Sequence, residues 1–427
     1  MAKEIKGEGF WQTVKKQLRK NKIAMFSLYF VGVLASIAIL ADVLANEKPL
    51  ICKYKDSVYF PVFRGGAVAL GINEWPKEFQ NVEWNNLPYD WAVFPPIPYL
   101  PKNVDYANAQ FVSPFADQVV KSTQWRHWLG TDNLGHDVLA GMIHGTRIAL
   151  LVGLVSMSIA SVIGIFFGAL AGYFGDDKLK VSRARIFVNI LFVYFAYFYA
   201  FNSRGYILAD AIGSSFINFS LQLIISFAIF IGIMLIGNLI VKPLKSIPFL
   251  SHRINVSVDM LVSRLIGIMV SIPTLFLIIS IIAIAKPSIF LVMAIIGLTG
   301  WTGIARFIRA ELLRVRSLEY IEAAHALGFN ETRIIFKHAI PNALSPVLIS
   351  IAFGIASAIL VESTLSFLGI GVPAEELTWG SLLASARQSP SAWWLAIFPG
   401  LAIFITVTIY NLVGEGLTDA LGPRLKK

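Results

Sequence analysis

Charged residues are scarce in this sequence. Only 15% of its 427 residues are Asp, Glu, Lys or Arg, whereas soluble domains average about a quarter. Hydrophobic residues make up 56% of the chain, and the mean hydropathy is +0.67. This composition excludes an ordinary soluble domain and predicts a protein with many membrane-spanning segments.

Residues and motifs that support catalysis or nucleotide binding are also few. The single cysteine, Cys52, cannot form a disulfide within the chain and does not indicate a redox compartment. The dipeptide Gly-Lys is absent, which excludes a phosphate-binding GxxxxGK[ST] loop, and no HExxH zinc motif occurs. We therefore expect no nucleotide site, cofactor, metal or catalytic residue in this chain.

The net charge of the sequence is +10. Such an excess can indicate nucleic-acid binding, but in a membrane protein it more often marks the loops that stay in the cytosol. Basic residues gather in segment 1–22, between the apolar runs and in the last four residues, 424–427. We therefore expect the lipid bilayer rather than nucleic acid as its partner, with both termini in the cytosol.

Eight stretches without any charged residue or histidine are long enough to cross a bilayer, which takes about 20 apolar residues. They cover residues 23–41, 148–175, 186–203, 211–241, 265–285, 287–305, 339–361 and 388–414. A gradient-driven transporter generally needs ionisable side chains at membrane depth, so this pattern argues against one. All six histidines lie outside these stretches, which argues against an intramembrane enzyme.

The N-terminal segment, residues 1–22, is basic and amphipathic, and we expect it to lie on the cytosolic membrane surface. The first transmembrane span is predicted over residues 23–45. A cleaved signal peptide is the alternative, since Val-Leu-Ala at 43–45 is an acceptable cleavage site. The apolar run is longer than an ordinary signal core, which favours an uncleaved anchor.

Residues 46–130 are predicted to form an extracytoplasmic insert. The stretch is rich in Pro, Trp, Tyr and Asn, which predicts loops with a few short strands or turns. Its aromatic residues could pack on the protein itself or contact a substrate-binding protein, and internal packing is the commoner case. Cys52 lies in this insert and is expected to react with a membrane-impermeant reagent from outside.

Residues 131–175 are predicted to form an entry turn followed by the second span. Their first part contains Asp132, His136, Asp137 and His144, a combination that suggests a metal site. The spacing fits none of the standard zinc or calcium patterns. The glycines and the Asp-Asn pair indicate turns before a helix that enters the membrane.

The stretch 317–341 is predicted to form a soluble helical hairpin between apolar segments. Ser317 is expected to cap the first helix and Asn330 the second, with Gly328 ending the first helix in a left-handed conformation. A narrow, mostly apolar stripe recurs at helical spacing along the first helix: Tyr320, Ala323, Ala324 and Leu327. Glu322 lies beside the stripe, so the hairpin could dock onto another protein; a plain interfacial helix is the alternative.

The same stretch resembles the coupling motif of ATP-binding-cassette importer permeases, which consists of EAA, three residues, Gly, nine residues and an apolar-x-apolar-Pro ending. The matching residues, implied by the resemblance to be the ATPase-coupling site, are Glu322, Ala323, Ala324, Gly328 and Pro341. Pro341 is expected to break the second helix of the hairpin where it turns into the next span. His338 replaces the aliphatic residue of the general pattern, as is usual in the dipeptide and oligopeptide branch. Further stretches follow the order of that branch: 127–153, 271–277 and 360–383.

The resemblance implies an all-α polytopic membrane protein with a six-span permease core. This chain departs from the family by inserting residues 176–253, which adds a pair of spans and gives eight in total. Because an even number is added, the sidedness of the following core, residues 254–427, is preserved. The added pair is rich in aromatic residues, which suits a lipid-facing position, with an aromatic core as the alternative.

The resemblance also implies a function: the permease subunit of an ATP-driven importer in a bacterial inner membrane. Such a subunit forms half of the translocation pathway with a second permease subunit, identical or different. Two cytosolic ATPase subunits bind ATP and Mg²⁺ and receive the hairpins, and an extracytoplasmic binding protein delivers the solute. Peptides are the implied substrate, and nickel or another small solute is the alternative within the same branch.

Overall fold

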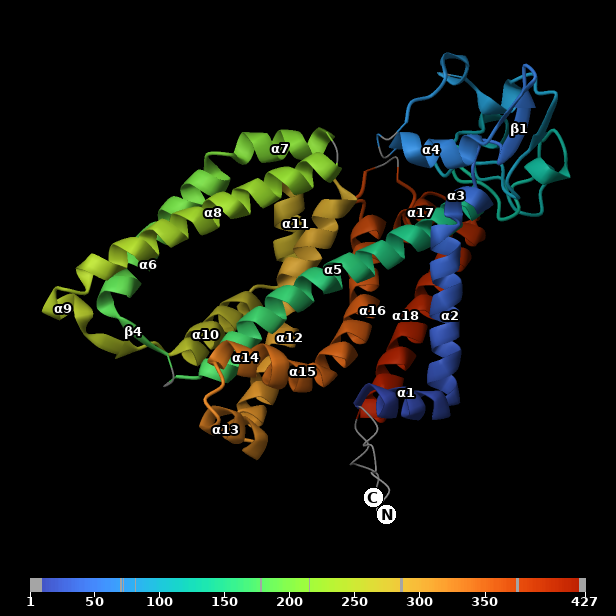
Figure 1. Ribbon diagram of the computed structural model, residues 1–427. Coiled ribbons are helices and arrows are strands. Elements are labelled where there is room, and N and C mark those ends of the chain that lie inside the picture. Colours follow the sequence, from blue (N-terminus) through green and yellow to red (C-terminus); the bar gives the residue numbers. More distant parts are fainter. Residues whose placement is uncertain are drawn as a thin grey trace. The chain divides into compact units, whose positions relative to one another are not determined.

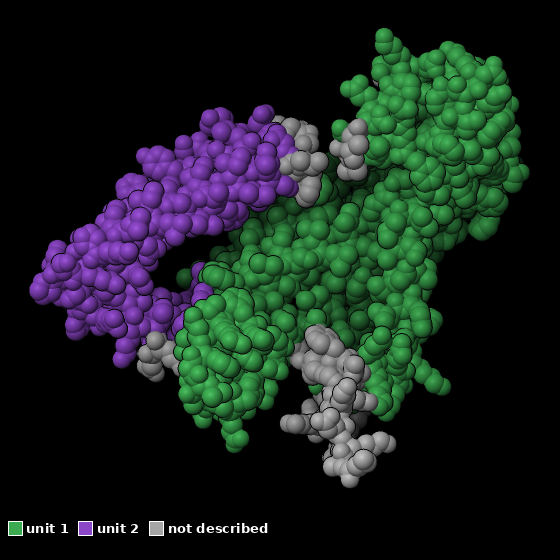
Figure 2. All heavy atoms as spheres, viewed as in Figure 1, with its two compact units in different colours: residues 1–169, 266–427 green, residues 170–265 purple. Residues whose placement is uncertain are grey.

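The computed structural model describes most of the chain in two compact units. The described residues are 10–69, 71, 73–80, 82–176, 179–214, 216–284, 287–373 and 376–421. One unit comprises residues 1–169 and 266–427, and the other comprises residues 170–265 (Figure 2).

Long apolar helices dominate both units, which confirms an all-α polytopic membrane protein (Figure 1). In the described part of the chain, seven helices are long and apolar enough to cross a bilayer, and a bent pair can supply an eighth span. The seven are α2 (Lys22–Ile39), α5 (Val138–Phe174), α6 with the π-helical η5 (Arg183–Asn202), α8 (Phe216–Leu244), α12 (Ile289–Val315), α16 (Ser345–Phe367) and α18 (Trp393–Leu421).

The bent pair replaces the straight span that the apolar run 265–285 suggests. Helices α10 (Val258–Ser271) and α11 (Thr274–Ile284) meet at an angle of 77°. Pro273 lies in the break; it has no N–H to donate and disfavours helical geometry in the residue before it. Apolar composition therefore located this span but not its break.

Several helices extend beyond the charge-free runs that predicted them. Helix α5 begins at Val138, ten residues before run 148–175, and α16 continues to Phe367. Glu362 therefore lies inside a membrane-spanning helix, although run 339–361 ends just before it. Backbone hydrogen bonding defines the ends of a helix, so a hydropathy boundary is only approximate.

The predicted insert forms a small sheet with short helices. The antiparallel strands β1 (Ile51–Tyr54), β2 (Ser57–Tyr59) and β3 (Trp91–Val93) are ordered β2-β1-β3. Lys55 and Asp56 have positive φ in the two-residue loop between β1 and β2, the conformation that tight hairpins require. The remaining elements are α3 (Ala41–Leu44), α4 (Pro61–Ala69) and the 3-10 helices η1 (Lys77–Phe79), η2 (Trp84–Asn86), η3 (Tyr106–Asn108) and η4 (Thr123–Trp125).

Many aromatic side chains of the insert pack against one another. Phe79 stacks on Trp84 with ring centroids 5.1 Å apart, and Tyr59 meets Phe79 edge to face at 4.9 Å. Cys52 is fully buried in β1, and desolvation raises the pKa of its thiol to about 11. The expectation that Cys52 reacts readily from outside is therefore wrong, because its side chain points into the core of the insert.

A buried histidine joins the insert to the second span. The His127 ring lies between Asp105 and Asp137, with nitrogen-to-oxygen distances of 3.1 and 2.8 Å, and Tyr99 stacks on it at 4.4 Å. Asp137 also accepts the backbone N–H of Ala140 in the first turn of α5. These carboxylates raise the pKa of His127 to about 9 despite its burial.

Two further residues of the suspected metal cluster, Asp132 and His136, bond to each other, and His144 Nε2 lies 2.9 Å from Ala45 O. His136 bonds Asp132 at 2.8 Å, and Asp132 accepts the N–H groups of Leu134 and His136, which shapes the turn. Within the described ranges, no group of three or more His, Cys, Asp or Glu side chains is arranged to hold a metal ion. The entry segment is thus a hydrogen-bonded turn leading into α5.

Glycines let the second span approach its neighbours closely. A Cβ atom at Gly164 would lie 2.7 Å from the Ile304 Cβ of α12, and one at Gly153 would lie 2.6 Å from Ile355 of α16. Gly145 similarly faces Trp379 of α17 (Trp379–Ser385), which is followed by η7 (Ala386–Gln388). Small residues at such crossings are typical of helix packing in membranes.

The unit formed by residues 170–265 contains the predicted additional pair of spans. Besides α6, η5 and α8 it comprises α7 (Gly205–Ser214), α9 (Pro248–Ser251) and the paired strands β4 (Lys180–Ser182) and β5 (Arg253–Asn255). These antiparallel strands bring its two ends together, and the N–H of Val256 donates to Leu179 O. An insertion with adjacent ends can be accommodated with little disturbance of the chain around it.

The aromatic residues of α6 and η5 lie mainly on the surface of that unit. Phe187, Tyr194 and Tyr197 are each more than half exposed, whereas Ala184 and Val188 are buried against α8. Phe201 is an exception because its ring packs edge to face on Phe227. This arrangement favours the lipid-facing interpretation.

Candidate functional site

The chain between α12 and α16 forms the predicted hairpin. Helix α13 (Glu319–Ala326) is followed by a turn and by a second helical arm. This arm consists of α14 (Glu331–Ile334), the π-helical turn η6 (Ile335–Ala339) and α15 (Ile340–Ala343). Figure 1 shows the hairpin at the end of α12 and at the beginning of α16.

Ser317 is not the N-cap of α13. That position is occupied by Leu318, and no side chain caps the helix there. The Ser317 hydroxyl instead donates to Arg314 O at 2.9 Å, in the last turn of α12. Since α12 continues to Val315, Ser317 still belongs to the exit from that helix.

The turn after α13 is a Schellman motif centred on Gly328. Its φ is +75°, as predicted, and its N–H donates to His325 O at 2.9 Å. The N–H of Phe329 donates to Ala324 O at 3.1 Å, which completes the two hydrogen bonds of the motif. Glycine adopts this left-handed conformation without a steric penalty, so residue 328 sets the direction of the second arm.

Asn330 begins the second arm, as predicted, by accepting the N–H of Thr332. Pro341 does not end this arm, which corrects the expectation that it breaks the helix before the next span. It lies in the first turn of α15, directly after the π-helical turn, where a missing N–H is tolerated. The chain passes into α16 three residues later, at Leu344.

Phe329, in the turn, packs against the second arm of the hairpin. The Arg333 guanidinium lies over its ring at 4.6 Å, and the His338 ring is nearly parallel to it at 6.5 Å. His325 and Glu331 add a link between the arms at 3.4 Å. His338, which departs from the general motif, therefore has a partner within the hairpin itself.

The inner side of the hairpin is apolar and buried. Ile321 and Ile334 are fully buried, and Ala324 is 7% exposed. This placement corrects the predicted stripe, because Ala324 belongs to the inner face together with Ile321. Leu312 and Val315, in the last turns of α12, are buried as well. The hairpin is thus fixed to the membrane helix by packing and not by its backbone alone.

The outer side of α13 presents the rest of the stripe. Tyr320, Ala323 and Leu327 are exposed at spacings of three and four residues, so they share one face of the helix. Glu322 is exposed beside them, and in the described part of the chain no ion pair or hydrogen bond engages its side chain. The result is a small apolar face with a free negative charge, mounted on a packed base.

Sequence reasoning missed Glu362, which is 1% exposed inside α16. Its carboxylate accepts hydrogen bonds from the Ser366 hydroxyl at 2.6 Å and the Ser363 hydroxyl at 3.4 Å. Serines one and four residues after a glutamate in an apolar helix could have indicated such an internal network. The charge-free run ends at residue 361, so Glu362 and these serines were not considered as part of the membrane span.

Comparisons with known proteins agree with this architecture. Residues 246–427 match the family described as "Binding-protein-dependent transport system inner membrane component". Residues 9–58 match the "N-terminal TM domain of oligopeptide transport permease C". The second match covers α1 (Phe10–Lys20), α2 and the beginning of the insert.

Two of the relatives cover most of the chain, and a third matches a shorter part more closely. The inner membrane ABC transporter permease protein YejE of Escherichia coli is 28% identical over 418 residues, 95% of either chain. The dipeptide transport system permease protein DppC of Alkalihalophilus pseudofirmus is 28% identical over 301 residues, 70% of this chain and 73% of its own. A putative peptide transport system permease protein of Brucella suis is 49% identical over 123 residues, 29% of this chain and 42% of its own.

The alignment with the E. coli relative extends over nearly the whole sequence. One family match contains the N-terminal helices and the other contains the hairpin, in the expected order along the chain. The spans, the hairpin and these matches lead to one assignment. Residues 246–427 belong to the family of inner-membrane components of binding-protein-dependent transport systems, and the chain as a whole is similar to inner-membrane permeases of ABC transporters.

Proposed function

We propose that this permease subunit imports peptides and that its hairpin, residues 317–341, couples it to a cytosolic ATPase. The peptide substrate is supported by the names of the relatives, which include dipeptide, di/tripeptide and oligopeptide permeases. The observation that carries the coupling role is the exposed face of α13, with Tyr320, Ala323, Leu327 and Glu322. A face of this size suits insertion into a cleft of a partner protein.

The rigidity of the hairpin supports its role in transmitting motion. Ile321 and Ile334 anchor it beneath the exposed face, and the Schellman turn at Gly328 fixes the angle between its arms. A displacement of α13 by a partner therefore moves the adjoining ends of α12 and α16 as one body. Rigid-body movement of packed helices is a common switching mechanism.

The proposed assembly contains this subunit, a second permease subunit, two cytosolic ATPases that bind ATP and Mg²⁺, and an extracytoplasmic binding protein. The subunit supplies half of the translocation pathway, and both of its termini lie in the cytosol. The path of α18 supports this sidedness: Trp394 at its beginning donates to Thr131 O beside the insert, whereas Gly416 near its end contacts Ala24 of α2. The insert and the beginning of α2 thus lie at opposite ends of this helix.

Charge changes at Glu322 test the coupling role. The assay is substrate-stimulated ATP hydrolysis by the reconstituted complex. Glu322→Gln keeps the shape and removes the charge, so we expect a severalfold loss. In the proposed complex Glu322 meets a basic residue of the ATPase, so Glu322→Lys brings two positive charges together in a partly desolvated cleft. This change should cost about 2 kcal/mol or more, at least about a thirtyfold loss of coupled activity.

An acidic residue introduced into the ATPase cleft should restore part of the activity of Glu322→Lys. Wild-type hydrolysis in both variants would refute coupling through this face. The substrate is tested separately, by identifying the solute that co-purifies with the binding protein. Recovery of a metal ion or another small solute in place of a peptide would refute the peptide assignment alone.

A further inference from the structure

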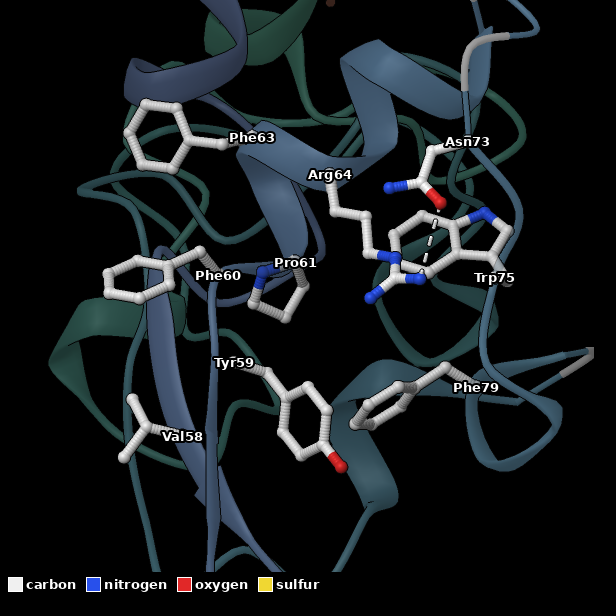
Figure 3. Close-up of a pocket in the computed structure, with 9 residues that line it drawn as sticks. All are labelled: Val58, Tyr59, Phe60, Pro61, Phe63, Arg64, Asn73, Trp75 and Phe79. Carbon is white, nitrogen blue, oxygen red and sulfur yellow. Dashed lines mark hydrogen bonds between the residues drawn. The ribbon is translucent and has the colours of Figure 1, made fainter.

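The extracytoplasmic insert contains a pocket that the coupling mechanism does not use. Its cavity measures about 310 Å³ and lies between β2, the beginning of α4 and the loop before η1 (Figure 3). The lining residues are Val58, Tyr59, Phe60, Pro61, Phe63, Arg64, Asn73, Trp75 and Phe79. A cavity of this size is at the small end of ligand pockets, with room for a small molecule or the end of a chain.

The aromatic wall of the pocket is held in place from behind. Phe79 is 3% exposed; its ring lies edge to face with Tyr59 and stacks on Trp84 at an interplanar angle of 16°. Trp75 also packs against Trp84, with ring centroids 5.1 Å apart. The wall is therefore formed before any ligand arrives, which reduces the entropy lost on binding.

Arg64 projects a positive charge into this pocket. Its Nε and one terminal nitrogen donate to Glu74 O at 3.2 and 2.9 Å, and the same terminal nitrogen reaches Asn73 Oδ1. Figure 3 shows the other terminal nitrogen turned toward the hollow between Pro61, Tyr59 and Phe79. Across the described ranges, no carboxylate forms an ion pair with this guanidinium, so its charge is balanced by no acidic side chain.

A second cation adds to the positive potential behind the wall. The Lys48 ammonium lies over the rings of Trp75 at 5.4 Å and Trp84 at 5.9 Å. Desolvation lowers its pKa and the charge of Glu47 partly offsets this effect; no carboxylate among the described residues forms an ion pair with it. The lysines of the β1–β2 hairpin differ: Lys53 bonds Asp56 at 3.0 Å, and Lys55 lies 3.7 Å from Glu78.

Exposed apolar side chains border the same pocket. Val58, Phe60 and Phe63 are 52, 53 and 61% exposed, although each lines the cavity. Such a border offers contact to an apolar group that remains near the surface, and Arg64 offers a charged hydrogen bond in the same pocket. The guanidinium stays charged at neutral pH, and a carboxylate can accept a charge-assisted hydrogen bond from the terminal nitrogen that faces the hollow.

We propose that this pocket binds a free carboxylate next to an apolar side chain, as at the C-terminus of a peptide. The Arg64 terminal nitrogen that faces the hollow binds the carboxylate, and Phe60, Phe63 and Phe79 contact the side chain. The proposal concerns binding to the insert and depends neither on the transport substrate nor on the coupling hairpin. It assigns the insert a ligand-binding role on the outer side of the membrane.

The test uses the full-length chain in lipid nanodiscs and two matched probes, N-acetylphenylalanine and its amide. Binding is measured by calorimetry and by saturation-transfer NMR. The two probes differ only in the charged group, so recognition by Arg64 should make the amide bind at least about tenfold more weakly. Equal binding of acid and amide, or no binding of the acid, would overturn the proposal without any substitution in the chain.

Two variants then locate the site. Arg64→Gln can still donate to Glu74 O but has no charge, and it should reduce acid binding to the level of the amide. Lys77→Gln removes an exposed charge from the same insert outside the pocket and should bind the acid like the unmodified chain. Full acid binding by Arg64→Gln, or an equal loss in both variants, would place the site elsewhere.

Discussion

Gly328 offers the sharpest test of the coupling hairpin, because its surroundings are open. No atom lies within 4 Å of the position that a Cβ would occupy here, so a substitution is limited by backbone conformation alone. A left-handed conformation costs an L-residue about 1–2 kcal/mol, and β-branched residues more. For Gly328→Val, a cost of about 2 kcal/mol lowers the population of the correct hairpin up to about thirtyfold.

We expect the affinity for the ATPase to fall by a similar factor, while membrane insertion stays normal. Co-purification with the ATPase and coupled hydrolysis measure it. Gly328→Asn is the matched variant, because asparagine tolerates the left-handed region, and it should retain most of the activity. Association with the ATPase should decrease in the order Gly, Asn, Ala, Val at residue 328, because this is the order of conformational cost and not of side-chain size.

Gly369 provides a control elsewhere in the same chain. It also has φ of +75° and nothing within 4 Å of a Cβ, and it ends α16 in the same kind of turn. Gly369→Val carries similar strain outside the hairpin and should keep its ATPase association. Wild-type association and hydrolysis in Gly328→Val, or an equal loss of association in Gly369→Val, would refute the reasoning.

Three further predictions concern the insert and the added spans. Deleting residues 176–253 should leave a core that still assembles with the ATPase, because β4 and β5 bring the ends of this segment together; loss of the complex on co-purification would contradict this. Because the pKa of His127 is raised on folding, protonated His127 stabilises the insert; this contribution is complete below pH 6.5 and is lost as the pH rises through about 9. Hydrogen exchange of the insert should therefore increase between pH 7 and 10. His127→Gln should remove that pH dependence, and an unchanged profile would show that the histidine does not cause it. An impermeant thiol reagent should leave buried Cys52 unreacted but label Phe115→Cys from outside and Asn330→Cys only from the cytosol; external labelling at residue 330 would invert the proposed topology.

The hairpin shows how local chemistry limits what a sequence can predict. Gly328 and Asn330 were placed correctly, because a left-handed glycine and an N-cap depend on hydrogen bonds within a few residues. Ser317 and Pro341 were placed wrongly. Ser317 follows α12 too closely to cap α13, and a π-helical turn places Pro341 inside the second arm. Neither the end of α12 nor the π-helical turn can be read from the residue itself.

In the insert, side-chain contacts depend on residues that are distant in the sequence. Its turns and short strands followed from proline, glycine and aromatic content, but the partners of its side chains did not. His127 lies between Asp105 and Asp137, which are 22 and 10 residues away in the sequence, and only the folded chain brings them together. The same holds for Cys52, whose burial depends on the packing of three strands.

Composition and local pattern by themselves determined the membrane class, the approximate spans, the hairpin and the motif that indicates the family. These features depend on hydropathy over about 20 residues or on hydrogen bonds between near neighbours. The tertiary structure alone decided the burial of Glu362 within α16 and the position of the Arg64 guanidinium in its aromatic pocket. These contacts arise when distant segments pack, and a sequence pattern of short range carries no record of such packing.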